Sequence, residues 1–270
     1  FVPLILGALF FLAYGLIQQK RTDYFELLTS VLLDIMFLSV GWHYCKQTFG
    51  CMMIAAKFSD YHINASQRKS LLFHIHTIWL FVFIYTHVSP STFDYYGFNY
   101  TSRLVLSKYL LVFWGLAFIV SLAFFLFHVV YAKYKKELVF PGIQFWIPLL
   151  AIYVWWLPFF SVGLFGMHMV PFFHSLQYLV FVKAYEDNSS QYSFPSIMVG
   201  LCLIGFLAFE GLPGLLANMI VVDQNLIGNF AFFTGFFAIF INIHHYFIDS
   251  VIWRLNSPHI RQNLLLEKAE

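Results

Sequence analysis

Two adjacent histidines and an aspartate lie near the end of the chain in a long apolar segment, INIHHYFIDSVIWRL at 241–255. His245 and Asp249 are four residues apart. On a helix their side chains therefore share a face, whereas that of His244 points about 100° away. If this helix lies in lipid, three ionisable groups stand where they are costly, and such residues are candidates for function by default. The segment is thus predicted to have a chemical role if the chain is a membrane protein.

Two further histidines have polar partners at the same helical spacing. His43 precedes Gln47 by four residues in GWHYCKQTFG, and in FFHSLQYL a glutamine and a tyrosine follow His174 by three and four residues. Metal-bound imidazoles usually donate their second N–H group to a carboxylate, a carbonyl or water. We therefore predict that four polar residues orient metal-ligating histidines: Gln47, Gln177, Tyr178 and Asp249.

Composition indicates that lipid surrounds these segments. The sequence is 60% hydrophobic and 10% charged, whereas about a quarter of the residues are charged in an ordinary soluble domain. A spanning helix needs about 20 apolar residues. Eight segments qualify, roughly 2–17, 27–56, 71–88, 104–132, 144–163, 165–183, 196–217 and 226–253. We predict an all-α integral membrane bundle of about eight transmembrane helices, a single domain over residues 1–270 that ends in a short cytoplasmic tail at 254–270.

Basic residues predict the orientation of this bundle. The loops after the first, third, fifth and seventh segments carry 4 Lys and Arg residues, whereas the other loops and the C-terminal tail carry 10. With Lys46 inside a helix, these account for all 15. Because cytoplasmic loops are rich in Lys and Arg, the second group and both termini are predicted to be cytoplasmic. The net charge of +2 gives no indication of a nucleic-acid partner.

In this topology most histidines gather at one depth. With a rise of about 1.5 Å per residue, seven of the 11 fall in the middle and inner half of the membrane, on five different helices. Imidazoles left unpaired in lipid are costly, so we predict that at least three of them bind metal. The predicted ligands are His43, His74, His76, His128, His174, His244 and His245.

The residue types favour a particular chemistry. Many imidazoles with few carboxylates suit iron, copper or zinc rather than magnesium or calcium, and the cysteines are not arranged to hold an iron–sulfur cluster. A histidine-rich site that is open to lipid suits oxygen chemistry on an apolar molecule. We therefore predict a metal-dependent membrane oxidoreductase of the oxygenase or desaturase type. Non-haem iron, mononuclear or dinuclear, is the favoured cofactor, and copper is an alternative. The expected partners are membrane lipids, a hydrophobic substrate, and an electron donor or a larger membrane complex.

A second hypothesis is an electron-transfer subunit that binds haem b between two helices. Its ligand pairs would combine His74 or His76 with His128 or His244. A Soret band in the absorption spectrum would distinguish it from the oxygenase.

A third hypothesis is a transporter or a non-catalytic subunit of a membrane complex. A single histidine in a membrane helix more often serves packing through hydrogen bonds than metal binding. Asp34 and Glu210 would then lie on a transport pathway, and the sequence Gly211-Leu212-Pro213-Gly214 must interrupt or end its helix. An interrupted helix beside a carboxylate can mark a transport site. The alternative is an outer helix end with a capping turn, which is the more common cause of such a pattern.

One segment resembles a known enzyme family. FFHSLQYL at 172–179 resembles the HSxRH stretch of the Brp/Blh β-carotene dioxygenases, which are multi-pass iron enzymes of similar length. The match covers His174 and Ser175, while Tyr178 stands in place of the second histidine and the GLPHGALD-type segment of that family is absent. The HxxxH and HxxHH boxes of membrane desaturases are also absent. The resemblance implies that a histidine at the position of His174 binds iron, and it assigns no catalytic role.

Overall fold

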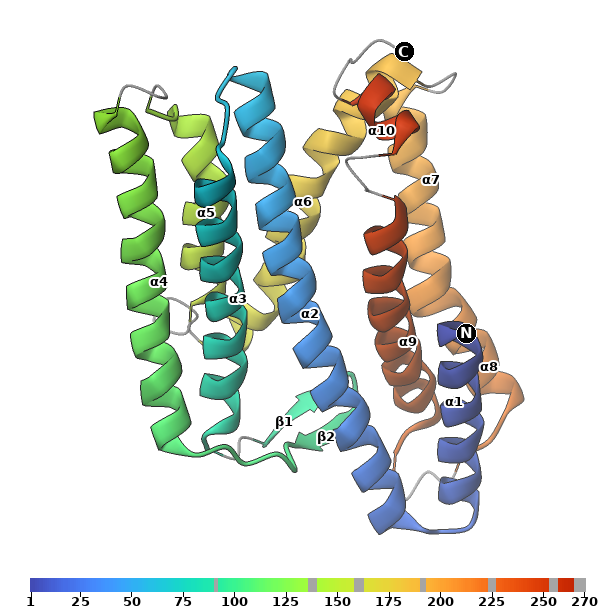
Figure 1. The fold of residues 1–270 in the computed structure, drawn as a ribbon. Helices are drawn as coiled ribbons and strands as arrows, with labels where there is room; N and C mark the ends of the chain where they lie inside the picture. Colours follow the sequence, from blue (N-terminus) through green and yellow to red (C-terminus); the bar gives the residue numbers. More distant parts are fainter. Residues whose placement is uncertain are drawn as a thin grey trace. The chain divides into compact units, whose positions relative to one another are not determined.

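The computed structural model describes residues 1–89, 92–135, 140–157, 163–189, 193–222, 227–252 and 257–264. The protein is mostly helical (Figure 1). Its α-helices are α1 (Val2–Gln18), α2 (Thr22–Phe58), α3 (Ala65–His87), α4 (Lys108–Tyr134), α5 (Ile143–Trp156), α6 (Gly163–Ser189), α7 (Phe194–Phe206), α8 (Leu212–Met219), α9 (Asn229–Ile252) and α10 (Pro258–Asn263). A π-helical turn, η1 (Leu207–Gly211), joins α7 to α8, and strands β1 (Thr92–Tyr95) and β2 (Phe98–Thr101) lie between α3 and α4.

Each of the eight predicted apolar segments coincides with a helix, but only five helical runs in the described ranges are long and apolar enough to cross a membrane. They are Thr22–Phe58, Ala65–His87, Lys108–Tyr134, Phe194–Met219 and Asn229–Asp249. The α1 helix and the apolar part of α5, Ile143–Val154, are shorter, and α6 ends in the polar stretch KAYEDN at 183–188. The chain is therefore a helical membrane protein, and its described part contains five candidate spans where the sequence predicts eight.

The helix around Pro213 is interrupted, as the sequence predicts, but it does not end there. The π-helical turn η1 ends at Gly211, and α8 continues from Leu212 to Met219. Proline has no backbone N–H, so it cannot donate the i→i−4 hydrogen bond of an α-helix. A wider π turn just before it accommodates this loss, and the whole run forms one candidate span.

The segment between α3 and α4 forms a β-hairpin that the all-α prediction did not include. The two strands pair antiparallel, with Tyr95 opposite Phe98. The turn residues Tyr96 and Gly97 both have positive φ, 50° and 88°, as a type I′ hairpin turn requires. Asp94 Oδ1 accepts a hydrogen bond from the Gly97 N–H at 3.0 Å, which closes the turn.

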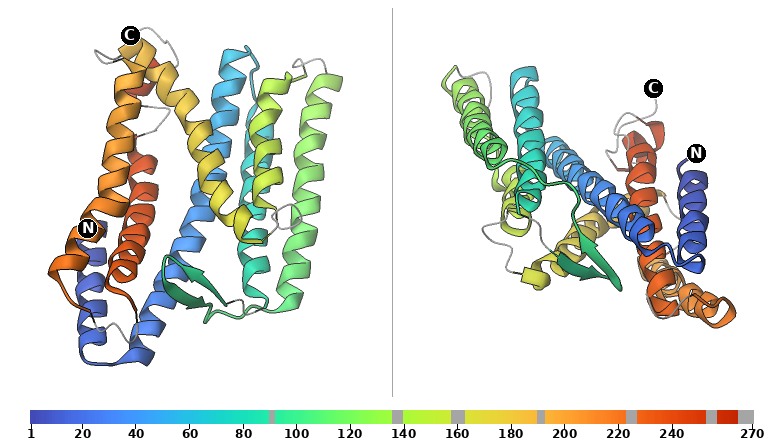
Figure 2. Two further views of the ribbon diagram at one scale, coloured as in Figure 1. Left: turned by 180° about the vertical axis from the view of Figure 1, so that it is seen from behind. Right: turned by 90° about the horizontal axis from the view of Figure 1, so that it is seen from below.

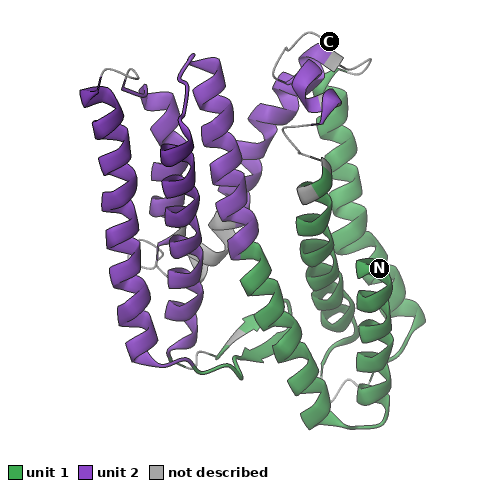
Figure 3. Cartoon of the chain, viewed as in Figure 1, with its two compact units in different colours: residues 1–40, 89–105, 191–252 green, residues 41–88, 106–190, 253–270 purple. Residues whose placement is uncertain are grey.

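The chain separates into two compact units (Figure 3). Unit 1 contains residues 1–40, 89–105 and 191–252, and unit 2 contains residues 41–88, 106–190 and 253–270. Helix α2 begins in unit 1 and continues into unit 2 after Val40. Within the predicted tail, residues 257–264 are described, and α10 forms there.

Aromatic rings fill the centre of unit 1. Helix α9 packs against α1, α8 and β2 (Figures 1 and 2). Three phenylalanines of α9 meet rings from α1, α2 and β2, and the cluster consists of Phe10, Phe25, Phe98, Phe232, Phe233 and Phe236. The hairpin thus contributes to the same core as the helices of this unit.

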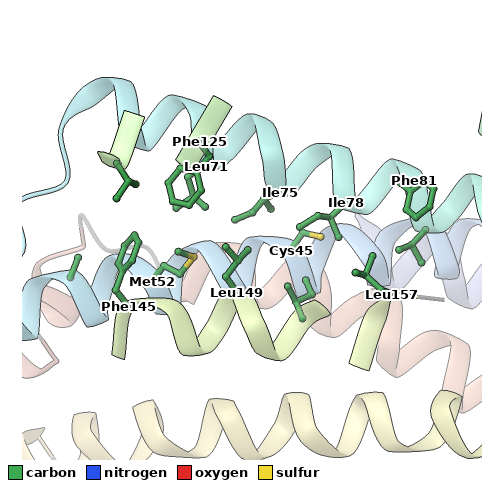
Figure 4. Close-up of a cluster of buried hydrophobic side chains, with 14 of the residues drawn as sticks. Cys45, Met52, Leu71, Ile75, Ile78, Phe81, Phe125, Phe145, Leu149 and Leu157 are labelled. Atoms are coloured by element: carbon green, nitrogen blue, oxygen red, sulfur yellow. The ribbon is translucent and has the colours of Figure 1, made fainter. Parts of the chain in front are cut away.

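Unit 2 has its own apolar core, to which four helices contribute (Figure 4). The buried side chains include Cys45, Met52, Leu71, Ile75, Ile78, Phe81, Phe125, Phe145 and Leu149. Figures 1 and 2 show α3 and α4 side by side, and α6 packs on α5 and α10. This core supports the second half of α2, which together with α6 carries the candidate site.

Candidate metal centre

Two imidazoles from different helices meet inside unit 2. Nε2 of His43, on α2, lies 3.1 Å from Nε2 of His174, on α6. Both side chains are buried, with 5% and 9% of their surface exposed. The ring centroids are 4.9 Å apart and the ring planes are inclined at 66°. The fold therefore brings together two predicted metal ligands that are 131 residues apart in the sequence.

Neighbouring groups hold the imidazole of His174 in this position. The ring of Tyr44, on α2, packs against it with a centroid separation of 4.3 Å. On α6, Ser175 Oγ donates a hydrogen bond to the backbone carbonyl of Pro171 at 2.8 Å. The imidazole of His174 is consequently in contact with two rings of α2, those of His43 and Tyr44.

The two predicted glutamines lie at this site. Gln47 Nε2 donates to the backbone carbonyl of His174 at 3.3 Å and lies 3.5 Å from Gln177 Oε1. The sequence predicts that both side chains orient the imidazoles. In the structure, Gln47 instead contacts the backbone of His174, and the two glutamine side chains contact each other. Gln47 thus connects α2 to α6 beside the histidine pair. Tyr178 is half-buried on α6, one turn beyond His174.

The pair fits adjacent positions around one metal ion. The two Nε2 atoms are 3.1 Å apart. For an ion at the ordinary metal–nitrogen distance of about 2.0–2.1 Å from each of them, the N–metal–N angle would be roughly 100°. This value lies between the octahedral angle of about 90° and the tetrahedral angle of about 109°. Two axial histidines of a haem stand on opposite sides of the iron, so this pair does not fit a bis-histidine haem.

His74, another predicted ligand in unit 2, is bonded to hydroxyl groups. Its Nδ1 lies 2.8 Å from Ser121 Oγ, and its Nε2 is hydrogen-bonded to the hydroxyl of Tyr153. Thr77 Oγ1 extends this network, at 2.7 Å from Ser121 Oγ. His74 and Ser121 are fully buried. Because both ring nitrogens of His74 have partners, it could bind a metal only by giving up one of these bonds. We interpret the network as a polar connection between α3, α4 and α5.

His76 and His128 have different surroundings. His76 is exposed, and its Nδ1 lies 2.6 Å from the carbonyl oxygen of Leu72 in the same helix. His128 is half-buried, with its ring against those of Phe124 and Phe127. Within the described ranges, neither belongs to a group of three or more potential metal ligands. Their metal-binding role stays a prediction.

The three ionisable residues of α9 are arranged in unit 1 as their spacing predicts. His245 Nε2 lies 3.6 Å from Asp249 Oδ2, one helical turn away. This distance is too long for a good hydrogen bond, but it is short enough for a charged imidazole to attract the carboxylate. The ring of His244 instead stacks on Phe240, with centroids 5.6 Å apart and planes at 25°.

Asp34, a candidate residue of the transport hypothesis, anchors the hairpin within unit 1. Its Oδ1 accepts hydrogen bonds from the hydroxyl of Tyr100 and, at 3.2 Å, from Ser102 Oγ. Burial, followed by the hydrogen bond to this carboxylate, raises the pKa of Tyr100 well above its usual value. The Tyr100 hydroxyl therefore keeps its proton at neutral pH and continues to donate it to Asp34. Glu210 lies in the π turn η1.

Sequence reasoning did not single out Tyr44, Ser121 or Tyr153. Tyr44 directly follows His43, and adjacent residues of a helix point in different directions. Their proximity in the sequence therefore did not indicate that both lie at one site. A hydroxyl inside an apolar run is a weak signal, because such groups commonly bond within their own helix.

No protein-family model, curated protein or solved structure matches this chain. Function is therefore inferred from the arrangement of its side chains.

Proposed function

We propose that this protein is a metal-dependent membrane oxidoreductase of the oxygenase or desaturase type, which acts on a lipid or another hydrophobic substrate. The observation that carries this proposal is the buried pair of His43 and His174, whose Nε2 atoms are 3.1 Å apart. Burying two imidazoles is costly unless their nitrogen atoms have polar partners. At 3.1 Å the two Nε2 atoms can share one hydrogen bond, whereas a cation between them would engage the lone pairs of both. Non-haem iron is the favoured ion, and copper is the alternative.

Each group at the site has a role in this proposal. The metal would supply the activation of molecular oxygen. His43 and His174 hold the ion in adjacent positions, which leaves other positions open for oxygen. Tyr44 packs against the imidazole of His174 and limits its rotation. The apolar helices around the pair keep water away from the reaction and accommodate an apolar substrate.

Further ligands come from the sequence analysis. Iron and copper centres of this kind use at least three protein ligands, and the histidine pair supplies two. The sequence predicts His244 and His245 as further ligands, and their part in this centre stays a prediction. Asp249 would orient His245, as carboxylates commonly orient metal-bound histidines.

We also propose a topology in which both termini are cytoplasmic. The distribution of Lys and Arg among the loops supports it. This topology requires α1, α5 and α6 to cross the membrane in addition to the five candidate spans. Electrons for oxygen reduction would come from a separate donor or from a larger membrane complex.

Metal analysis of the purified protein tests this proposal. We expect the protein, extracted in detergent without chelators, to contain one or two equivalents of iron or copper and to show no Soret band. The variants His43→Ala and His174→Ala should each retain at least tenfold less metal, and His244→Ala and His245→Ala test the ligands taken from sequence. His62→Ala, at an exposed position in a polar loop, is the matched control and should retain wild-type metal.

Three outcomes would refute the proposal. Wild-type metal content in both His43→Ala and His174→Ala would show that the pair does not bind the ion. A Soret band would favour the haem-binding electron-transfer subunit. A wild-type protein without metal would leave the pair as hydrogen-bonded imidazoles, as in the transporter or scaffold hypothesis.

A further inference from the structure

The side-chain amide of Gln47 has one satisfied end and one unsatisfied end. Its Nε2 donates to the backbone carbonyl of His174 at 3.3 Å and faces Gln177 Oε1 at 3.5 Å. Its Oε1 is buried and has no hydrogen-bond partner in the part of the chain that the structure describes. A carbonyl oxygen can only accept a hydrogen bond, so the amide cannot be turned around without placing two acceptors against each other.

The residue that carries this unsatisfied oxygen neighbours both histidines of the pair. Gln47 follows His43 by one turn of α2, on the same face, and its nitrogen is bonded to the backbone of His174. Buried polar atoms without a partner are rare in native proteins, and an unassigned water or ion is one of their ordinary explanations. We therefore expect a hydrogen-bond donor beside Gln47 Oε1 at the proposed metal centre.

We propose that Gln47 Oε1 accepts a hydrogen bond from a water molecule coordinated to the ion that His43 and His174 hold. This inference rests on the proposed metal site. Water bound to a metal ion is polarised and is a strong donor, and an amide oxygen accepts its hydrogen without removing the proton. Gln47 is then a positioning residue for the exchangeable coordination position, at which oxygen would replace water.

Azide binding to the cobalt(II) form tests this role. The protein in detergent is stripped of metal, loaded with cobalt(II) and titrated with sodium azide at one fixed pH, while its visible absorption is recorded. Azide displaces the water and has no proton, so its binding to the wild type breaks the hydrogen bond to Oε1. Gln47→Leu removes the acceptor, and we expect azide to bind about fivefold to tenfold more tightly, with unchanged cobalt stoichiometry.

Two further variants sharpen the result. Gln47→Glu keeps the shape but offers a charged acceptor that holds the water and repels the anion, so azide should bind at least tenfold more weakly. Leu176→Ala changes an exposed side chain on the same helix, α6, and leaves both glutamines in place. As the matched control it should stay within twofold of the wild type. If Gln47→Leu does not fold, Gln47→Glu against Leu176→Ala decides the question.

The outcomes separate this inference from the proposed function. Cobalt binding with unchanged azide affinity in both Gln47 variants would overturn the role of Gln47 and leave the metal site intact. An equal gain in azide affinity in Leu176→Ala would indicate a loosened site and would also overturn it. A folded wild type that takes up no cobalt would overturn the proposed function itself.

Discussion

The hairpin of unit 1 approaches α9 so closely that one glycine of that helix has no room for a side chain. A Cβ atom at Gly235 would lie 2.7 Å from Cε2, 2.9 Å from Cζ and 3.0 Å from Cδ2 of Phe98. Carbon atoms in favourable contact are about 3.5–4.0 Å apart. Phe98 is 2% exposed and packs between Phe25 and Phe236, with centroid distances of 6.0 and 5.2 Å. Its ring therefore cannot move into open space.

The substitution Gly235→Ala should destabilise the protein by a measurable amount. The ring or the helix must shift by about 1 Å to restore normal contact, and such overpacking typically costs about 1–3 kcal/mol. The higher helix propensity of alanine offsets about 1 kcal/mol of this cost. Because three ring atoms lie within 3.0 Å of this Cβ, we expect the cost to fall in the upper part of the range, about 2–3 kcal/mol. The net loss of about 1–2 kcal/mol lowers the Tm by about 2–8 °C in a chain of this size.

Thermal unfolding in detergent, followed by circular dichroism at 222 nm, measures this loss. The matched control is Gly205→Ala on α7 of the same unit, where a Cβ would meet nothing within 4 Å. That variant should unfold at the wild-type temperature or above it. Phe98→Leu in the Gly235→Ala background should recover part of the loss. A Tm of Gly235→Ala equal to or above that of the wild type would refute the packing argument.

The remaining predictions concern the polar networks. His74→Phe should lower the unfolding temperature, because it removes both hydrogen bonds of the imidazole, while the metal content of the folded protein stays at the wild-type level; a loss of metal would instead make His74 a ligand. Asp34→Leu leaves the buried hydroxyl of Tyr100 without its carboxylate acceptor, whereas Ser102 Oγ can still donate to the carbonyl of Leu104 at 3.1 Å. It should destabilise the protein by about 1–3 kcal/mol, measured by the same thermal scans; unchanged stability would contradict this. The raised pKa of Tyr100 means that its contribution to stability is complete below the unfolded pKa of about 10 and is lost as the pH rises above it. Thermal scans at pH 9 and pH 11 should therefore show a larger loss of stability for the wild type than for Tyr100→Phe, and equal losses would contradict the assignment.

The positions of the helices could be predicted from the sequence, because helix formation in lipid depends on the residues within each segment. An apolar run has to satisfy its own backbone hydrogen bonds in lipid, and a helix does so within the segment. Each predicted run accordingly forms a helix. Fewer of these helices qualify as spans within the described ranges, because α1 and the apolar part of α5 are short and α6 ends in a charged stretch.

The hairpin could not be predicted from its own residues. Its strands have four residues each, and a two-stranded hairpin of this length is marginally stable by itself. It forms where Phe98 packs into the core of unit 1 and Tyr100 bonds to Asp34. These contacts join residues far apart in the sequence, which no local pattern indicates.

The contacts of the histidines also divide into those that the sequence predicts and those that only the fold determines. The sequence by itself determined that His245 and Asp249 lie one turn apart on a face that His244 does not share, because the period of a helix fixes which neighbours meet. It could not distinguish His43 from His74, which are both buried histidines in apolar helices. Only the tertiary structure brought His43 to His174 and His74 to Ser121 and Tyr153. The physical reason is that contacts between helices depend on how each helix is rotated and packed against its neighbours, and this is decided by the whole core.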